Sequence, residues 1–121
     1  MIAPPQPITI CLVEDDVELS ESVARYVDGT PGFRCLGAYA SGEVALAEIP
    51  RQQPAGVLMD INLPGMSGIE CVAQLRGTMP ALLVFMLTAY TKLHVHSRIE
   101  AVVKTMGRRD HPQAPRPGTG R

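Results

Sequence analysis

Short apolar runs recur along the chain, and each is separated from the next by a stretch in which apolar residues return at helical spacing. The runs are bounded by turn residues and most of them lack interleaved polar positions. This pattern is typical of strands that are buried on both faces of a parallel sheet. The predicted strands are Ile8–Val13, Phe33–Tyr39, Gly56–Asp60 and Ala81–Leu87.

Three helices are predicted between these strands, because each intervening stretch opens with a residue that can cap a helix. In the first stretch, Leu19, Val23 and Val27 recur every fourth residue and line one face. The third opens with Ser67 and Glu70, which match the two side chains of a capping box. The predicted helices cover 17–27 with Asp16 as N-cap, Ser41 to about Ile49, and Ser67 to about Leu75; a fourth is predicted within 92–106.

Strands that alternate with helices predict an α/β protein with a parallel sheet and helices on both of its faces. The length of 121 residues is enough for one domain with a core. No apolar run is long enough to span a bilayer, and the N-terminus lacks the regions of a signal peptide. We therefore expect a cytoplasmic protein that does not enter a membrane. The three cysteines form no CxxC pair and predict neither a disulfide framework nor a zinc site.

Charge divides the chain into two unequal parts, although the net charge is only −1. Residues 1–90 carry four Arg, no Lys and ten acidic residues, whereas residues 91–121 carry seven basic and two acidic residues. Residues 107–121 contain three Gly, three Pro and four Arg, with Ala114 as the single apolar residue. Such a segment cannot bury enough surface to offset the entropy of ordering. The sequence therefore predicts one domain at 8–106, followed by a disordered basic tail at 107–121.

Acidic and hydroxyl side chains follow the predicted strands at the points where the strands end. Glu14-Asp15-Asp16 follows the first strand, Asp60 closes the third, and Thr88 follows the fourth. Because chemistry in an open α/β sheet lies outside the carboxyl ends of the strands, these side chains are expected at one edge. Asp16 is better explained as a helix cap than as a ligand.

Ionised carboxylates that lie close together repel one another unless a cation compensates them. Mg²⁺ binds one or two carboxylates, a carbonyl oxygen and several waters, and the backbone carbonyl of Asn62 is a candidate for the carbonyl ligand. Asp60 would then keep an oxygen that can attack phosphorus, as carboxylates do when they form aspartyl-phosphates. The metal would neutralise the charge that develops on the phosphoryl group.

The chain resembles the receiver domain of two-component response regulators over about residues 8–90. The resemblance implies a flavodoxin-like, doubly wound parallel sheet, in which the strands identified here take the order 2-1-3-4. The motifs that carry it are Leu12-Val13-Glu14-Asp15-Asp16, Ser41-Gly42-Glu43-Val44-Ala45-Leu46, Leu58-Met59-Asp60-Ile61-Asn62-Leu63-Pro64-Gly65-Met66-Ser67-Gly68 and Leu87-Thr88-Ala89-Tyr90.

The resemblance also implies roles for individual residues. Asp60 would accept a phosphoryl group from the phosphohistidine of a histidine kinase, and Thr88 would act as the switch hydroxyl that turns toward it. Glu14 and Asp15 match the acidic pair of the family, and together with Asp60 and the Asn62 carbonyl they would hold Mg²⁺. The chain would thus be a phosphoacceptor with possible autodephosphorylation, and not a turnover enzyme.

The sequence departs from the family after residue 90. Where the family carries a Lys-Pro pair after a fifth strand, this chain reads Arg108-Arg109-Asp110-His111-Pro112, and no apolar run for that strand precedes it. We therefore expect a receiver that is incomplete at its C-terminus, through truncation or a frame shift after about residue 90. No DNA-binding domain is expected in this chain, and a homodimer is possible.

Two alternatives use the same residues differently. A degenerate receiver would serve as an interaction or dimerisation module without phosphorylation, and the missing Lys favours it. A phosphohydrolase would use Asp60 as its nucleophile. That chemistry needs a second Asp as general acid two residues on, and Asn62 cannot donate a proton in this way.

Overall fold

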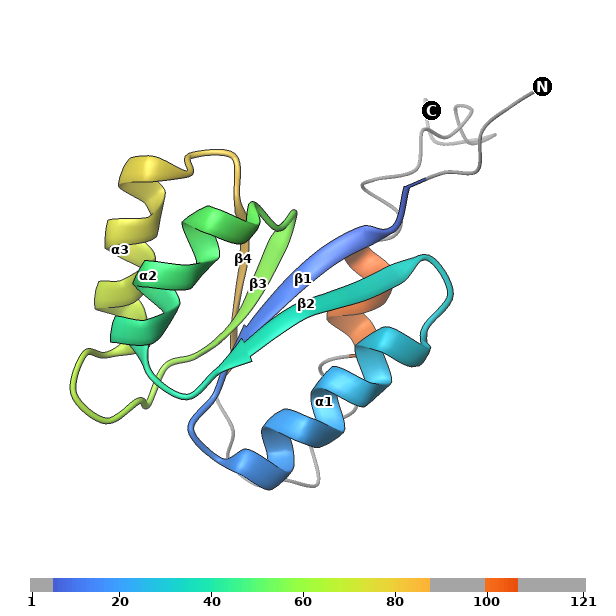
Figure 1. Cartoon of the computed structure of the whole chain (residues 1–121), viewed down its shortest axis with the longest axis horizontal. Coiled ribbons are helices and arrows are strands. Elements are labelled where there is room, and N and C mark those ends of the chain that lie inside the picture. Colours follow the sequence, from blue (N-terminus) through green and yellow to red (C-terminus); the bar gives the residue numbers. More distant parts are fainter. Residues whose placement is uncertain (1–5, 88–99, 107–121) are drawn as a thin grey trace, which may run out of the picture.

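A four-stranded parallel sheet forms the centre of the computed structural model, which describes residues 6–87 and 100–106. The strands lie in the order β2-β1-β3-β4, with helices on both faces of the sheet (Figure 1). The predicted fold class and the predicted strand order 2-1-3-4 are therefore confirmed. The elements are β1 (Ile8–Val13), α1 (Val17–Gly29), β2 (Phe33–Tyr39), α2 (Gly42–Gln52), β3 (Gly56–Asp60), α3 (Gly68–Thr78) and β4 (Leu83–Leu87), followed by helical residues at 100–106.

The apolar runs form strands because their residues are buried on both faces. All five residues of β3, the strand between β1 and β4, are buried. The register aligns Leu12 with Leu58 and Leu58 with Phe85, so one apolar row crosses three strands. β1 and β2 pair with an irregular register between Ile10 and Cys11.

The predicted caps begin all three helices between the strands. The side chains of Asp16, Ser41 and Ser67 accept hydrogen bonds from the backbone N–H groups of residues 19, 44 and 70. The capping box of α3 is complete, because the Glu70 side chain also accepts from the Ser67 N–H. These caps satisfy backbone donors that the first turn of a helix leaves without partners.

All three helices between the strands extend further toward the C-terminus than predicted. α2 continues past Pro50 to Gln52, because a proline in the last turn removes only one helical hydrogen bond, and the Gln53 N–H still donates to the Ile49 carbonyl at 3.0 Å. α1 and α3 likewise extend to Gly29 and Thr78.

The fourth strand begins later than predicted, at Leu83 instead of Ala81. The Leu82 N–H donates to the Met79 carbonyl at 3.1 Å, and the Arg76 guanidinium donates to the Leu82 carbonyl at 2.6 Å. Both backbone groups of Leu82 are thus used by the turn and not by the sheet.

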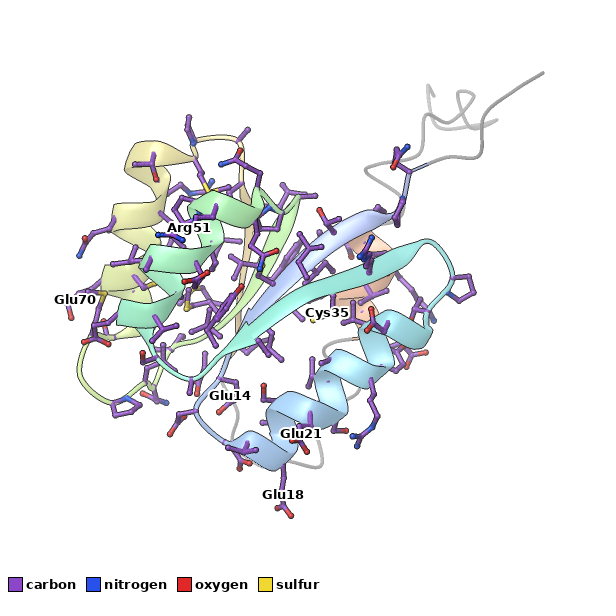
Figure 2. All side chains as sticks on the ribbon, in the orientation of Figure 1. Glu14, Glu18, Glu21, Cys35, Arg51 and Glu70 are labelled. Carbon is purple, nitrogen blue, oxygen red and sulfur yellow. The ribbon has the colours of Figure 1, made fainter. Side chains whose placement is uncertain are left out.

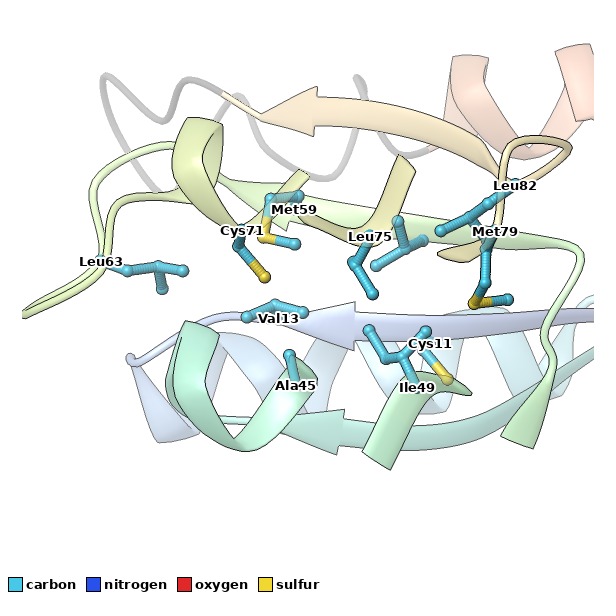
Figure 3. Packing of buried hydrophobic residues seen from close by; sticks show 11 residues of the cluster. Cys11, Val13, Ala45, Ile49, Met59, Leu63, Cys71, Leu75, Met79 and Leu82 are labelled. Atoms are coloured by element: carbon cyan, nitrogen blue, oxygen red, sulfur yellow. The ribbon is translucent and has the colours of Figure 1, made fainter. Parts of the chain in front are cut away.

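Two apolar cores sandwich the sheet. One lies between the sheet and α2 and α3, and it includes Val13, Met59 and Leu75 (Figure 3). The other lies on the face covered by α1 and the helical residues 100–106, and it includes Leu12, Leu58 and Met106. Burial raises the pKa of the Cys11 thiol to about 12 and that of Cys71 to about 11, so both buried thiols are protonated at neutral pH.

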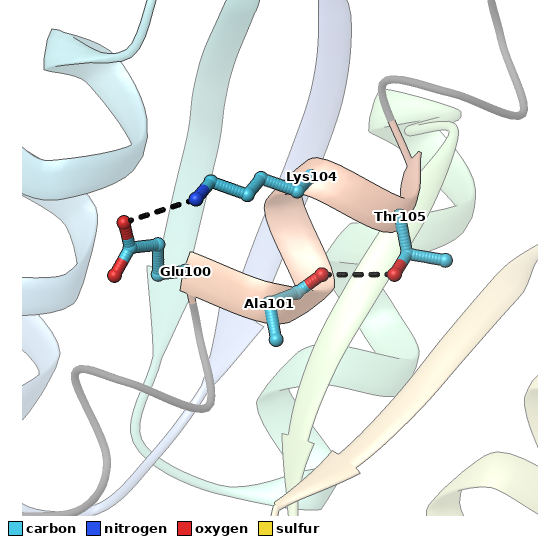
Figure 4. A network of polar contacts seen from close by, with 4 residues as sticks. All are labelled: Glu100, Ala101, Lys104 and Thr105. Atoms are coloured by element: carbon cyan, nitrogen blue, oxygen red, sulfur yellow. Dashed lines mark hydrogen bonds and ion pairs between the residues drawn. The ribbon is translucent and has the colours of Figure 1, made fainter.

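The helical residues 100–106 belong to this second core, because Val103 and Met106 are almost fully buried in it. The end of the Met106 side chain lies against Gly56, where a β-carbon would require that side chain to shift. On the outer side, Lys104 and Glu100 form an exposed ion pair at 3.4 Å, and the Thr105 hydroxyl donates to the Ala101 carbonyl (Figure 4).

The part of the chain that the structure describes contains no helix long and apolar enough to cross a membrane. The tail predicted at 107–121 and most of the predicted fourth helix lie outside the described residues. The domain boundary at residue 106 and the disorder of the tail therefore stay predictions.

Candidate functional site: an acidic cluster at the carboxyl end of the sheet

Glu14 continues directly from β1 and lies where the strand leads into α1 (Figure 2). Its backbone N–H donates to the Tyr39 carbonyl at 2.9 Å, which joins it to the end of β2. Its carboxylate accepts a hydrogen bond from the Asp16 N–H at 3.0 Å, while Asp16 itself accepts from the Leu19 N–H at 3.1 Å. Asp16 is therefore the N-cap of α1, as predicted, and the side chain of Glu14 is held by the backbone at the start of that helix.

Asp60 is the last residue of β3, and its side chain is held by the loop that follows. The Asn62 N–H donates to Asp60 Oδ1 at 3.0 Å. The Ile61 N–H donates to the Leu87 carbonyl at 3.3 Å, so the loop starts beside the end of β4. The hydrogen bond from Asn62 thus orients the carboxylate, and the bond from Ile61 fixes the start of the loop.

The loop after Asp60 folds back so closely that only glycine fits at position 68. The Gly68 N–H donates to the Ile61 carbonyl at 3.1 Å. A β-carbon on Gly68 would collide with the backbone carbonyl of Asp60. Gly68 thus brings the start of α3 against the end of β3 and fixes the length of the loop between them.

Three carboxylates meet at this edge of the sheet. Each of Glu14, Asp15 and Asp60 offers an oxygen, and these atoms lie within 4.8 Å of one another. Glu14 and Asp60 are each only 7% exposed, whereas Asp15 is exposed. Within residues 6–87 and 100–106, no Lys or Arg forms an ion pair with any of the three.

Burial and the negative charges of neighbouring carboxylates disfavour ionisation of the two buried groups. Burial is the main cause that raises the pKa of Glu14 to about 7, and the negative charge of Asp60 adds to it. The pKa of Asp60 is also raised by burial, against the effect of the hydrogen bond from the Asn62 N–H. The cluster is therefore electrostatically strained when all of its members are ionised.

A hard divalent cation fits this donor set. Mg²⁺ binds oxygen at about 2.0–2.1 Å, so two oxygens on opposite sides of one ion are about 4.2 Å apart. The separation of the carboxylate oxygens is on that scale. A cation would also offset the burial and the repulsion that together raise the pKa of Glu14.

The structure brings together three of the predicted site residues, namely Glu14, Asp15 and Asp60. For Asn62 it shows the N–H donating to Asp60, while the predicted role of the Asn62 carbonyl as a metal ligand stays a prediction. Thr88 lies outside the described residues, so its predicted role as switch hydroxyl also stays a prediction.

One side chain that organises the site loop has no role among those predicted from the sequence. Glu43, in the first turn of α2, accepts a hydrogen bond from the Met66 N–H at 3.2 Å. Gly65, which precedes Met66, has φ +74, and a β-carbon there would lie 3.0 Å from Glu43 Oε2. The only available signal was the glycine, since the hydrogen bond spans 23 residues of sequence.

Comparisons with known proteins agree with this fold. The family model for the response regulator receiver domain matches residues 10–106. The probable transcriptional regulatory protein TcrX of Mycobacterium tuberculosis is 38% identical over 87 residues, which cover 69% of this chain and 35% of that protein. A protein-glutamate methylesterase/protein-glutamine glutaminase 1 of Syntrophus aciditrophicus is 30% identical over 95 residues, which cover 78% of this chain and 27% of that protein.

One solved structure shows the same fold over nearly the whole chain. The response regulator domain of CheB from Thermotoga maritima has a TM-score of 0.75 and 15% sequence identity, and the match covers 88% of this chain and 100% of that one. The chain spans between about a quarter and a third of the length of the two curated relatives named above. The match of the family model over 97 consecutive residues, together with the sheet order, shows that this chain belongs to the response regulator receiver domains.

Proposed function

We propose that Asp60 accepts a phosphoryl group from the phosphohistidine of a histidine kinase, in a reaction that requires Mg²⁺. The observation that carries this proposal is the convergence of Glu14, Asp15 and Asp60, whose carboxylate oxygens lie within 4.8 Å of one another at the carboxyl end of the sheet. An anionic nucleophile and an anionic phosphoryl group repel each other, and a cation held by the neighbouring carboxylates offsets that repulsion.

In this reaction an oxygen of Asp60 attacks phosphorus, the P–N bond to the donor imidazole breaks, and a P–O bond forms. The imidazole nitrogen leaves with the bonding electron pair and takes up a proton. The Asn62 N–H keeps the Asp60 carboxylate in position through its hydrogen bond to Oδ1. Glu14, Asp15 and the Asn62 carbonyl are the proposed metal ligands beside Asp60. Bound Mg²⁺ would neutralise the negative charge that develops on the phosphoryl group.

The signal would pass through Thr88, whose hydroxyl is proposed to turn toward the phosphoryl group. Leu87, its neighbour in sequence, already accepts a hydrogen bond from Ile61 in the site loop. The chain would act in the cytoplasm as a phosphoacceptor without turnover, with a histidine kinase as partner and any DNA-binding output on another polypeptide or segment.

The test is intact-mass spectrometry after incubation of the full chain with a small-molecule phosphodonor, such as acetyl phosphate, and Mg²⁺. The wild-type chain is expected to gain one phosphoryl group, which EDTA prevents. Asp60→Asn should gain none, while the matched control Asp28→Asn should behave as wild type. Asp28 lies on α1 and accepts from the Cys35 N–H, which an asparagine oxygen can also do. Absence of an adduct on the wild-type chain would refute the proposal.

A second candidate function is a receiver that works without phosphorylation, as an interaction module. It is favoured by one observation, namely that the sequence has Asp110 where the family carries its lysine. Titration with Mg²⁺ separates the two functions, because a module without a competent site would show no saturable binding and the phosphoacceptor would.

The frame-shift hypothesis stays a prediction, and it fails if no other reading frame after codon 90 encodes a Gly-Ala…Lys-Pro segment.

A further inference from the structure

β4 lies at one edge of the sheet in the part of the chain that the structure describes, and it pairs only with β3 there. Its sequence is Leu-Val-Phe-Met-Leu, without a charged or polar side chain. The first four residues are only partly buried. A partly exposed strand of this composition at an edge presents unpaired backbone groups next to apolar surface.

The side chains of β4 are those of an interior strand. Leu83, Phe85 and Leu87 pack with the core on the α1 side, while Val84 and Met86 pack with the core on the α2 and α3 side. Strands buried on both faces have this continuous apolar pattern, whereas natural edge strands carry lysines, prolines or bulges.

The opposite edge of the sheet shows the contrast. β2 carries the exposed residue Arg34, and its register with β1 shifts between Ile10 and Cys11. A charge and an irregular register both hinder pairing with a further strand. Of the two edges formed by the described strands, that of β4 is the better suited to accept another strand.

Hydrogen bonds at the two ends of β4 identify the backbone groups of this strand that face outward. The Leu83 N–H donates to the Ala55 carbonyl at 3.1 Å, and the Leu87 carbonyl accepts from the Ile61 N–H at 3.3 Å. In a parallel strand, successive residues direct their N–H and C=O groups to alternate sides. Residues 83, 85 and 87 therefore face β3, and the backbone groups of Val84 and Met86 face away from it.

We propose that the β4 edge binds the β4 edge of a second copy of this chain, in antiparallel orientation about a two-fold axis. Val84 of each copy then lies opposite Met86 of the other, and each pair exchanges N–H and C=O hydrogen bonds. Phe85 lies opposite Phe85 of the second copy at the axis, in a pair without backbone hydrogen bonds, where Cα atoms are about 4.5 Å apart. Aromatic pairs at such positions stabilise antiparallel strands.

The second copy is favoured over other occupants by charge and by chain length. Arg76 contacts the turn at the start of β4, whereas the acidic cluster lies near its end, so antiparallel pairing brings opposite charges together. A parallel strand from this chain would have to follow the helical residues 100–106. Residues 107–121, which follow that helix in the sequence, carry three prolines and a single apolar residue, a composition that disfavours a strand.

The first experiment measures the mass of the full chain in solution over a wide range of concentrations, by light scattering or sedimentation. The wild-type chain is expected to form a dimer. Val84→Pro and Met86→Pro each remove an outward N–H without removing a bond to β3, and should weaken the dimer about tenfold or more. Ile69→Ser is the control, since it removes an apolar side chain that is 62% exposed on α3, far from the proposed contact in sequence, and should leave dimerisation unchanged.

A second measurement, by disulfide cross-linking, tests the dimer even if the proline variants unfold. Cysteines at directly opposed positions have Cα atoms within the range that a disulfide spans. Phe85→Cys should therefore form a covalent dimer under mild oxidation, faster than the control Ile69→Cys. A single-chain mass for the wild type at all concentrations would overturn the proposal and indicate that another segment covers the edge. Cross-linking of Phe85→Cys no faster than that of the control would overturn it as well.

Discussion

The cluster of Glu14, Asp15 and Asp60 should make the stability of the metal-free protein depend on pH. The pKa of Glu14 in the folded chain is about 7, above the ordinary value of 4.5. A carboxyl whose pKa is higher in the folded state binds its proton more tightly there, so it stabilises the fold at low pH. This contribution is complete below about pH 4.5 and is lost as the pH rises to about 7. The pKa of Asp60 is also raised and acts in the same direction.

The size of the effect follows from the change in pKa of Glu14. Each tenfold change in the proton affinity is equivalent to about 1.4 kcal/mol, so ionisation of Glu14 costs the folded state up to about 3 kcal/mol. That cost is a large share of the free energy of unfolding of a typical domain, which is roughly 5–15 kcal/mol. Mg²⁺ at about 100 times its dissociation constant would return about 2.7 kcal/mol, provided that it does not bind the unfolded chain.

Urea denaturation in EDTA at pH 5 and pH 8 measures this contribution, with Glu14→Gln as the matched variant. The wild-type chain should lose about 2 to 3 kcal/mol more than Glu14→Gln between the two pH values, and Mg²⁺ should restore stability at pH 8 far more than at pH 5. Equal pH dependence of the two proteins, or no effect of Mg²⁺ at pH 8, would refute the electrostatic account of the site.

Two further predictions concern packing. Gly68→Ala should lower the free energy of unfolding by about 1–3 kcal/mol in urea titrations, because the new β-carbon meets the Asp60 carbonyl. The same substitution should slow phosphorylation of Asp60. An unchanged denaturation midpoint would contradict the close contact. Met106→Ala should cost about 2–5 kcal/mol if residues 100–106 complete the core, whereas the exposed control Lys104→Ala should cost less than about 1 kcal/mol; equal effects would show that this helix contributes no core packing.

Much of the fold could be predicted from local signals. The caps at Asp16, Ser41 and Ser67 and the apolar runs depend on neighbouring residues only, and the structure confirms them. The predicted positions of the helix ends are less accurate, because a helix end depends on single hydrogen bonds, such as that from the Gln53 N–H to the Ile49 carbonyl. The start of β4 depended on Arg76, a side chain in the preceding helix that binds the Leu82 carbonyl.

The carboxylates of the site could be predicted because they end strands, and strand ends meet at one edge. Their supporting contacts could not. Glu43 reaches the Met66 N–H across 23 residues, and Gly68 is required by a close approach to Asp60 that only the folded loop creates. Propensity and spacing describe neighbours along the chain, whereas these contacts depend on how α2, β3 and α3 come together.

The hydrogen bonds that hold the carboxylates make it possible to remove a carboxylate without changing the position of the side chain. Glu14 is held by the Asp16 N–H and Asp60 by the Asn62 N–H, and both donors are backbone groups that require an oxygen acceptor but no charge. An amide side chain presents an oxygen of the same geometry. Asp60→Asn and Glu14→Gln therefore remove a carboxylate while leaving an oxygen acceptor. Loss of phosphorylation or of Mg²⁺ binding in these variants then reports on the carboxylate, through its charge and, at Asp60, its nucleophilic oxygen, and not on a displaced loop.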